Sequence, residues 1–122
     1  MARVIRPQPG RRPNAVHICA RGPGERPITV GRSSDQDIVA TRDCVSVSRR
    51  HAEITWATPT RFRVRNFSPN GTWLWDRGRW HRIPNGAAWL SWGSLLAVGR
   101  PRGNYLLLVV EPPALPFTRS GA

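Results

Sequence analysis

The sequence has two cysteines, no lysine and no long hydrophobic run. The cysteines, Cys19 and Cys44, show no CxxC spacing and no neighbouring histidine pair, which argues against a metal site. No apolar run approaches the roughly 20 residues of a membrane-spanning helix. The first six residues also lack the apolar stretch of a signal peptide. These absences predict a cytoplasmic protein with no metal, no cofactor and no membrane contact.

Acidic residues are few. There are 7 of them against 19 basic residues, all arginine, which gives a net charge of +12. Such a surface attracts polyanions: nucleic acid, anionic membranes, or acidic and phosphorylated protein segments. The arginines are scattered along the chain, and a GC-rich genome also favours arginine over lysine. Charge alone therefore does not choose the partner, and a solvated basic surface is the competing interpretation.

The chain has no sustained helical period and no internal repeat. Short β-like segments separated by Gly, Asn and Pro turns occupy residues 15–20, 26–30, 38–40, 52–56, 62–66, 72–75, 79–83, 88–91, 95–98 and 105–110. Many short strands at this spacing predict an all-β fold, an antiparallel sandwich or barrel. The segment 105–110 is apolar on both faces and should be a central strand. The six tryptophans, mostly in strand segments, are expected in the core.

The 122 residues fit one domain with two loose ends. Residues 1–14 are rich in Arg, Pro and Gly, which predicts a flexible basic arm. Residues 112–122 are rich in Pro and small residues, which predicts a flexible tail. The folded domain is therefore expected over residues 15–111.

Polar motifs stand where apolar segments meet loops. They offer the guanidinium of Arg32, the hydroxyl of Ser48 and the amide of Asn70, donors that an anion such as phosphate needs. Each motif also has a plain structural explanation: a bulge, a turn, or, for His51, a residue that ties one loop to another.

A serine close to a histidine raises the question of nucleophilic catalysis. Ser48 and His51 would need a third residue to orient the imidazole, and an oxyanion hole. The only other histidines are His17 and His81, and the sequence has no Gly-x-Ser-x-Gly elbow. We therefore predict that the protein is not an enzyme.

Taken in order, the motifs resemble the forkhead-associated (FHA) domain. The matching blocks are Gly-Arg-Ser-Ser-Asp-Gln-Asp-Ile-Val at 31–39, Val-Ser-Arg-Arg-His-Ala-Glu-Ile at 47–54, Asn-Phe-Ser-Pro-Asn-Gly-Thr-Trp-Leu at 66–74 and Gly-Ser-Leu-Leu-Ala-Val-Gly at 93–99. The resemblance covers roughly residues 15–111. It implies a SMAD/FHA-like β-sandwich of about eleven strands whose loops at one end bind phosphothreonine peptides.

The resemblance also implies roles for single residues. Arg32 and Ser48 would hold the phosphate, Arg49 would add a contact, Asn70 would hold the peptide main chain, and Ser68 would shape its loop; Gly31, His51 and Gly71 would be architectural. The chain departs from the family pattern at three positions: Pro69 stands where Thr is common, and Asn66 and Ser94 each replace an Asp. Pro69 bears on peptide preference, whereas the other two should alter loop bracing.

The predicted function is a phosphothreonine-dependent protein-interaction module in signalling, with a Thr-phosphorylated protein or peptide as partner. Two alternatives stay open. One is nucleic-acid binding, with a weak contact through the basic arm and exposed Arg and Trp; the core placement of most Trp argues against it. The other is a phosphate-independent scaffold with the same fold. The partner, its kinase and the oligomeric state are left open.

Overall fold

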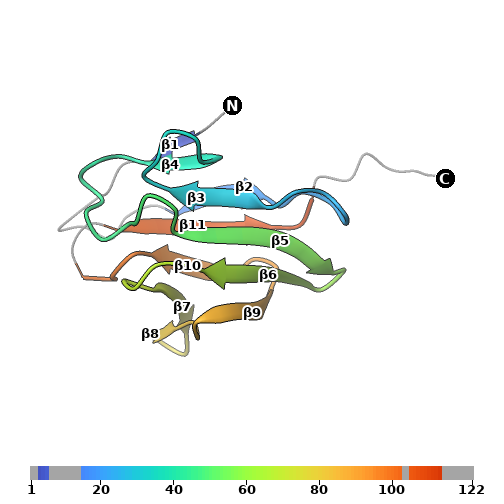
Figure 1. Ribbon diagram of the computed structural model, residues 1–122. Coiled ribbons are helices and arrows are strands. Elements are labelled where there is room, and N and C mark those ends of the chain that lie inside the picture. Colours follow the sequence, from blue (N-terminus) through green and yellow to red (C-terminus); the bar gives the residue numbers. More distant parts are fainter. Residues whose placement is uncertain (1–2, 6–14, 103–104, 114–122) are drawn as a thin grey trace.

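Two β-sheets make up the protein in the computed structural model, which describes residues 3–5, 15–102 and 105–113 (Figure 1). The six-stranded sheet has the order β1 (Arg3–Ile5), β4 (Ile38–Ala40), β3 (Ile28–Gly31), β5 (Ala52–Thr58), β6 (Arg61–Asn66) and β9 (Gly86–Ser91). The five-stranded sheet has the order β2 (Val16–Cys19), β11 (Leu106–Glu111), β10 (Leu95–Val98), β7 (Thr72–Asp76) and β8 (Arg79–Arg82). Within the described residues there is no helix that could cross a membrane.

Every segment predicted as a strand forms one, with ends that move by a few residues. The reason is the two-residue period of a strand with one buried face. In β6, Phe62 and Val64 point inward and are 0% exposed, whereas Arg63 and Arg65 alternate with them on the outer face. β11 lies between β2 and β10, so the prediction of an internal strand is confirmed.

The sheets are mixed, whereas the sequence predicted an antiparallel sandwich. β1 and β3 both pair parallel with β4, and β2 pairs parallel with β11. A strand's own sequence does not reveal the direction of its partner. Val30 lies opposite Ile38, so the loop between β3 and β4 returns the chain to the start of a parallel strand instead of forming a hairpin. β2 and β11 come from opposite ends of the domain, so no tight turn constrains their direction.

The predicted flexible arm, residues 1–14, contains β1. Its backbone pairs with the otherwise open edge of β4, from Arg3 opposite Ile38 to Ile5 opposite Ala40. Val4 and Ile5 are β-branched residues that favour a strand, a signal masked by the Arg, Pro and Gly around them. Residues 1–2, 6–14 and 114–122 lie outside the described part of the chain. They make up most of the predicted arm, with its predicted nucleic-acid contact, and most of the predicted tail.

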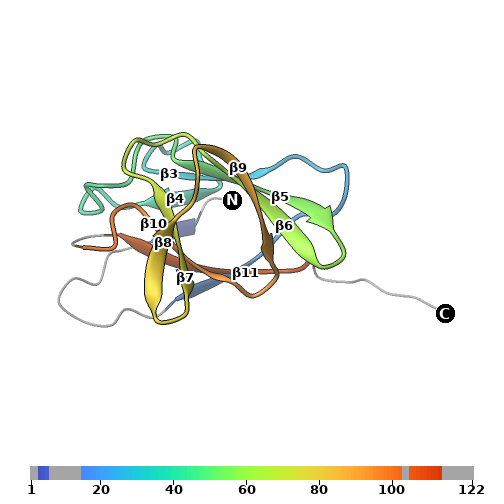
Figure 2. The same cartoon turned by 90° about the horizontal axis from the view of Figure 1, so that it is seen from below.

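The two sheets face each other (Figure 2). Aliphatic side chains, the Cys44 thiol and one phenylalanine form the core between them. The largest fully buried side chains are Phe62, Ile54, Leu96, Leu106 and Leu108. Both cysteines are free thiols.

The prediction that the tryptophans form the core is wrong. None of the six is among the buried residues; Trp75 is 40% exposed and Trp89 is 54% exposed. The inward positions of β7 belong to Thr72 and Leu74, so the same alternation turns Trp75 outward. Trp92 alone packs against the core, with its ring 5.4 Å from that of Phe62. The argument that placed tryptophan in the core and so against nucleic-acid contact no longer holds.

Candidate functional site

The loops that carry the sequence motifs meet at one end of the sandwich, at the left in Figure 1. They are the connections at residues 32–37, 41–51 and 67–71 and the segment 99–102. Backbone hydrogen bonds join them: Arg32 N donates to Ser48 O at 3.0 Å, and Gly99 N donates to Gly71 O at 3.1 Å. The motifs, which are distant in sequence, therefore share one surface.

Gly31 allows the first two loops to touch. A Cβ at this position would lie 2.0 Å from Arg49 O and 3.0 Å from Ser48 O. Beside it, Ser33 N donates to Arg49 O at 3.0 Å. Only glycine permits this approach, and the approach sets Arg32 next to Ser48.

Asp37 holds the far end of the 32–37 loop. Its carboxylate accepts hydrogen bonds from Thr29 N at 2.9 Å and from the Arg21 guanidinium at 3.2 and 3.3 Å. Burial raises the pKa of Asp37, but the hydrogen bonds from Arg21 and Thr29 outweigh burial and lower the pKa to about 2. The loop is thus anchored by a carboxylate that is charged at neutral pH.

Three arginines line a hollow of about 420 Å³ at this end. It is lined by Arg32, Ser33, Arg42 and Arg49. The Arg32 Nε donates to the Val47 carbonyl, which orients the side chain. No carboxylate lines the hollow, so its local charge is strongly positive. The sequence motifs included Arg32 and Arg49 but missed Arg42, whose only signal was the general basicity of the chain.

The Ser48 hydroxyl lies 2.6 Å from the Ser68 hydroxyl. Ser68 is 2% exposed, and its Oγ accepts a hydrogen bond from Asn70 N at 3.1 Å. If Ser68 then gives its own proton to Ser48 Oγ, the Ser48 proton is left for an anion. Ser68 is therefore placed to orient Ser48 and Asn70 from below the surface.

Asn70 connects its loop to the preceding one. Its Nδ2 donates to Ser46 O at 2.9 Å. Among the described residues no hydrogen bond occupies its Oδ1, which leaves that acceptor and one amide hydrogen for a ligand. Next to it, the Pro69 carbonyl accepts a hydrogen bond from Arg82 Nη2 at 2.7 Å. Arg82, from β8, is a second residue that the motifs did not include.

Asn66 braces the same loop from within. Its Nδ2 donates to Ser68 O at 2.8 Å, and its Oδ1 accepts a hydrogen bond from the Thr72 hydroxyl at 3.0 Å. An amide can serve both groups, whereas a carboxylate could only accept. The Asn at this position thus fits its surroundings.

His51 is 0% exposed and bridges two of the loops. Its Nδ1 accepts a hydrogen bond from Ser48 N at 3.0 Å, so Nε2 carries the proton and donates to Gly71 O at 2.7 Å. Both ring nitrogens are bonded to backbone groups, and the Ser48 hydroxyl is bonded to Ser68. This is not the geometry of a serine activated by a histidine.

Acid should weaken the fold through His51. Burial lowers the pKa of His51, and the bond to Gly71 opposes that shift. The unfolded chain therefore binds a proton on this residue more readily, and stability should fall as pH drops below about 6.5. Thermal unfolding at pH 7.5 and 5.5 would measure the fall. In His51→Gln the pH-dependent part should shrink, whereas in His81→Gln it should persist; equal dependence in wild type and His51→Gln would contradict the assignment.

Comparison with protein families gives a match to the FHA domain over residues 28–99. The chain belongs to the FHA domain family. Among solved structures, the FHA domain of the CT664 protein from Chlamydia trachomatis is 27% identical, with a TM-score of 0.50, over 68% of this chain and 76% of that one. The FHA-2 domain of the ABC transporter Rv1747 from Mycobacterium tuberculosis is 29% identical, with a TM-score of 0.42, over 75% and 71%.

A third solved FHA domain, studied for phosphothreonine-dependent interactions, is 23% identical, with a TM-score of 0.48, over 76% of this chain and 81% of that one. No match was found among curated proteins. The family and the β-sandwich that the motifs predicted are confirmed.

Proposed function

We propose that this FHA domain binds phosphothreonine peptides and acts as a protein-interaction module. The observation that carries the proposal is the hollow of about 420 Å³ that Arg32, Arg42 and Arg49 line and that no carboxylate lines. A phosphorylated side chain brings nearly two negative charges and three acceptor oxygens at neutral pH. Arg clusters are the means by which this class of domain recognises such groups.

Each predicted residue then has a role that its contacts support. Arg32 binds the phosphate in the hollow, and Arg49 and the added Arg42 supply further charge. Ser48 does not line the hollow but lies next to it, since its backbone carbonyl accepts a hydrogen bond from Arg32 N, and its hydroxyl is proposed to donate to the phosphate from there. Asn70 binds the peptide main chain through its unoccupied Oδ1. Ser68, which was expected to shape the binding loop, is buried, and its hydroxyl supports Ser48 and Asn70. Gly31, His51 and Gly71 hold the loops together.

Titration calorimetry with matched peptides tests the proposal. A peptide with one phosphothreonine should bind, and its unphosphorylated form should bind at least about a hundredfold more weakly, because the hollow has no other anion to satisfy its guanidinium groups. Equal affinity for both peptides would identify a phosphate-independent scaffold instead.

Nucleic-acid contact is the second candidate, since Arg63 lies 5.8 Å from the centre of the exposed Trp89 ring, a pair on which a base could stack. The same titration with a single-stranded oligonucleotide at physiological salt would decide between the two. Tighter binding of the oligonucleotide than of the phosphopeptide would favour this candidate.

A further inference from the structure

The described residues contain four edge strands, β1 and β9 in one sheet and β2 and β8 in the other. Folded proteins protect such edges with short strands, charged residues, proline or bulges, because an open edge can pair with another extended chain. β1, β2 and β8 have three or four residues, and β8 carries arginine at both ends. β9, the lowest strand of its sheet in Figure 1, has six residues without charge or proline, and its register against β6 contains no bulge. β9 is therefore the edge that lacks these protections.

The main chain of β9 is available on its free side. Within the described part of the molecule, the backbone of residues 86–90 makes no hydrogen bond outside its pairing with β6. The Ser91 carbonyl is the exception, since it accepts hydrogen bonds from Ser94 N at 3.2 Å and from Ser94 Oγ at 2.7 Å. An edge of this kind can add one more strand through main-chain hydrogen bonds.

A groove of about 450 Å³ lies beside this edge and is lined by residues of β9 and of β7 in the other sheet. Leu74 and Leu90 line it and also pack against the core, whereas Trp75 and Trp89 line it and are 40% and 54% exposed. Asp76 is the carboxylate in the lining, and it lies 3.9 Å from the guanidinium of the next residue. Side chains alternate along a strand, so every second side chain of a strand added to β9 would point toward this groove.

The other side chains of an added strand would lie near Arg63. Arg63 pairs with Thr55 on β5 and with Trp89 on β9, so neither directly paired residue supplies a carboxylate. Its guanidinium lies 5.8 Å from the centre of the Trp89 ring, and its buried Nε has no hydrogen-bond partner. Among the described residues Arg63 forms no ion pair. Because neighbouring strands lie about 4.8 Å apart, an acidic side chain next to Trp89 would be within reach of Arg63.

We propose that the β9 edge binds an extended segment of a partner protein by strand addition, with apolar side chains toward the groove alternating with acidic side chains toward Arg63. Charge complementarity selects this occupant. A second copy of the chain would instead bring another net charge of +12 and a second Arg63 to the same edge. None of the residues that line the phosphate hollow lies on β6, β7 or β9, so the site is independent of the proposed function.

The test titrates the full chain with the unphosphorylated peptide acetyl-Glu-Val-Glu-Val-Glu-Val-Glu-amide and follows backbone amides by NMR. Amides of β9 should shift, and their hydrogen exchange should slow. Two N-methylated peptides carry the methyl groups on the Glu or on the Val nitrogens, which removes the donors from one or the other edge of the extended peptide. At least one of them should bind at least about tenfold more weakly than the parent, because a set of ladder hydrogen bonds is lost.

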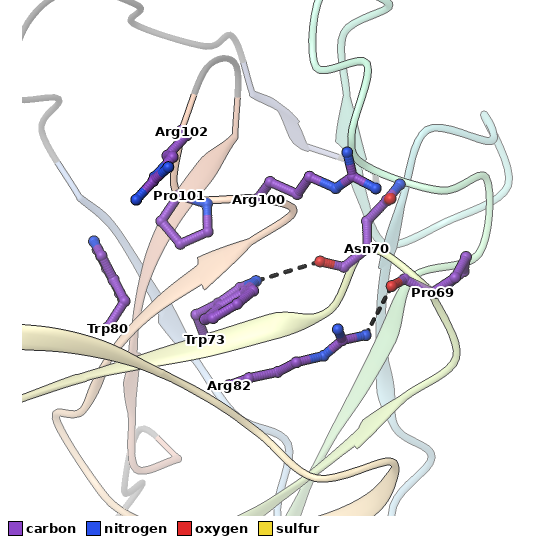
Figure 3. Close-up of a pocket in the computed structure, with 8 residues that line it drawn as sticks. All are labelled: Pro69, Asn70, Trp73, Trp80, Arg82, Arg100, Pro101 and Arg102. Carbon is purple, nitrogen blue, oxygen red and sulfur yellow. Dashed lines mark hydrogen bonds between the residues drawn. The ribbon is translucent and has the colours of Figure 1, made fainter.

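Arg63→Gln should weaken binding of the parent peptide about fivefold, the loss expected for a partly exposed ion pair. Arg100→Gln is the matched control, because it removes the same charge from an exposed side chain near Asn70 (Figure 3), and its affinity should stay close to that of the wild type. The β9 amide signals of each free variant report whether the strand is still folded. Because the peptide carries no phosphate, the result does not depend on the phosphothreonine titration.

Four results would overturn the proposal. Both N-methylated peptides bind like the parent, so that no ladder forms. Arg63→Gln and Arg100→Gln weaken binding equally, which would show general attraction to a basic protein. A single-stranded oligothymidine shifts the β9 amides at lower concentration than the peptide, which would assign the Arg63–Trp89 pair to nucleic acid. The free protein sediments as a dimer with its β9 amides already protected, which would make a second copy the occupant.

Discussion

Arg32→Ala should weaken binding of a phosphothreonine peptide by about 2–5 kcal/mol, because a desolvated phosphate would lose its best-oriented charged partner. The Arg32 side chain is fixed by its Nε bond to the Val47 carbonyl, so its terminal nitrogens are preorganised for two parallel hydrogen bonds. The bond from Arg32 N to Ser48 O is a backbone bond and survives the substitution. The loss should therefore appear mainly in affinity, while the lost Nε bond to the Val47 carbonyl should cost at most about 1 kcal/mol in the free energy of unfolding.

Calorimetry with phosphorylated and unphosphorylated peptides measures this loss. Arg32→Lys keeps the charge but not the planar fork, and should fall between wild type and Arg32→Ala. Arg61→Ala removes the same charge from the exposed end of β6 and should change affinity little beyond the effect of net charge. If Arg61→Ala and Arg32→Ala weaken binding equally, the phosphate does not bind beside Arg32.

Local patterns explain what could be predicted from the sequence. A strand with one buried face is visible in consecutive residues, as Phe62 and Val64 show in β6. Arg32 and Ser48 each lie in a short family motif that can be read from consecutive residues. Because the resemblance gives both residues a role at the phosphate, their proximity could be expected without coordinates.

Long-range contacts explain what could not be predicted. The 41–51 loop, which carries Arg42, is held by residues distant in sequence. The Ser46 carbonyl accepts a hydrogen bond from the Asn70 side chain, 24 positions away, and the Ser46 hydroxyl accepts one from Arg100 N, 54 positions away. Arg82 enters the site from β8 through the Pro69 carbonyl. No window of the sequence contains these pairs.

The Pro69 carbonyl shows how this chain accommodates its departure from the family. Proline removes a hydroxyl and a backbone donor from the binding loop. Arg82 instead donates a hydrogen bond to that carbonyl, and both residues line a hollow of about 520 Å³ next to Asn70 (Figure 3). The loop thus keeps a fixed Pro69 carbonyl although it lacks the donors that threonine would supply.

Gly31→Ala should be the most damaging single-methyl addition in the binding end. The added Cβ would lie 2.0 Å from Arg49 O and 2.7 Å from Arg49 C, and both belong to a backbone that cannot rotate away. To relieve the clash, the 32–37 and 41–51 loops must separate, which strains the bonds from Arg32 N to Ser48 O and from Ser33 N to Arg49 O. We expect a loss of about 2–4 kcal/mol in the free energy of unfolding, together with loss of phosphopeptide binding.

Gly22→Ala is the matched control, because its new Cβ would meet only the Glu25 carboxylate, at an ordinary 3.5 Å. Chemical denaturation of the two variants should therefore show a large shift for Gly31→Ala and almost none for Gly22→Ala. Binding measurements distinguish a loss of stability from a change in the shape of the site. If Gly31→Ala is merely less stable, excess peptide at low temperature will restore full occupancy with wild-type affinity. If instead the loops have moved apart, affinity stays low in the fraction that is folded. A Gly31→Ala protein with wild-type stability and affinity would show that the close approach of these loops is not needed for the site.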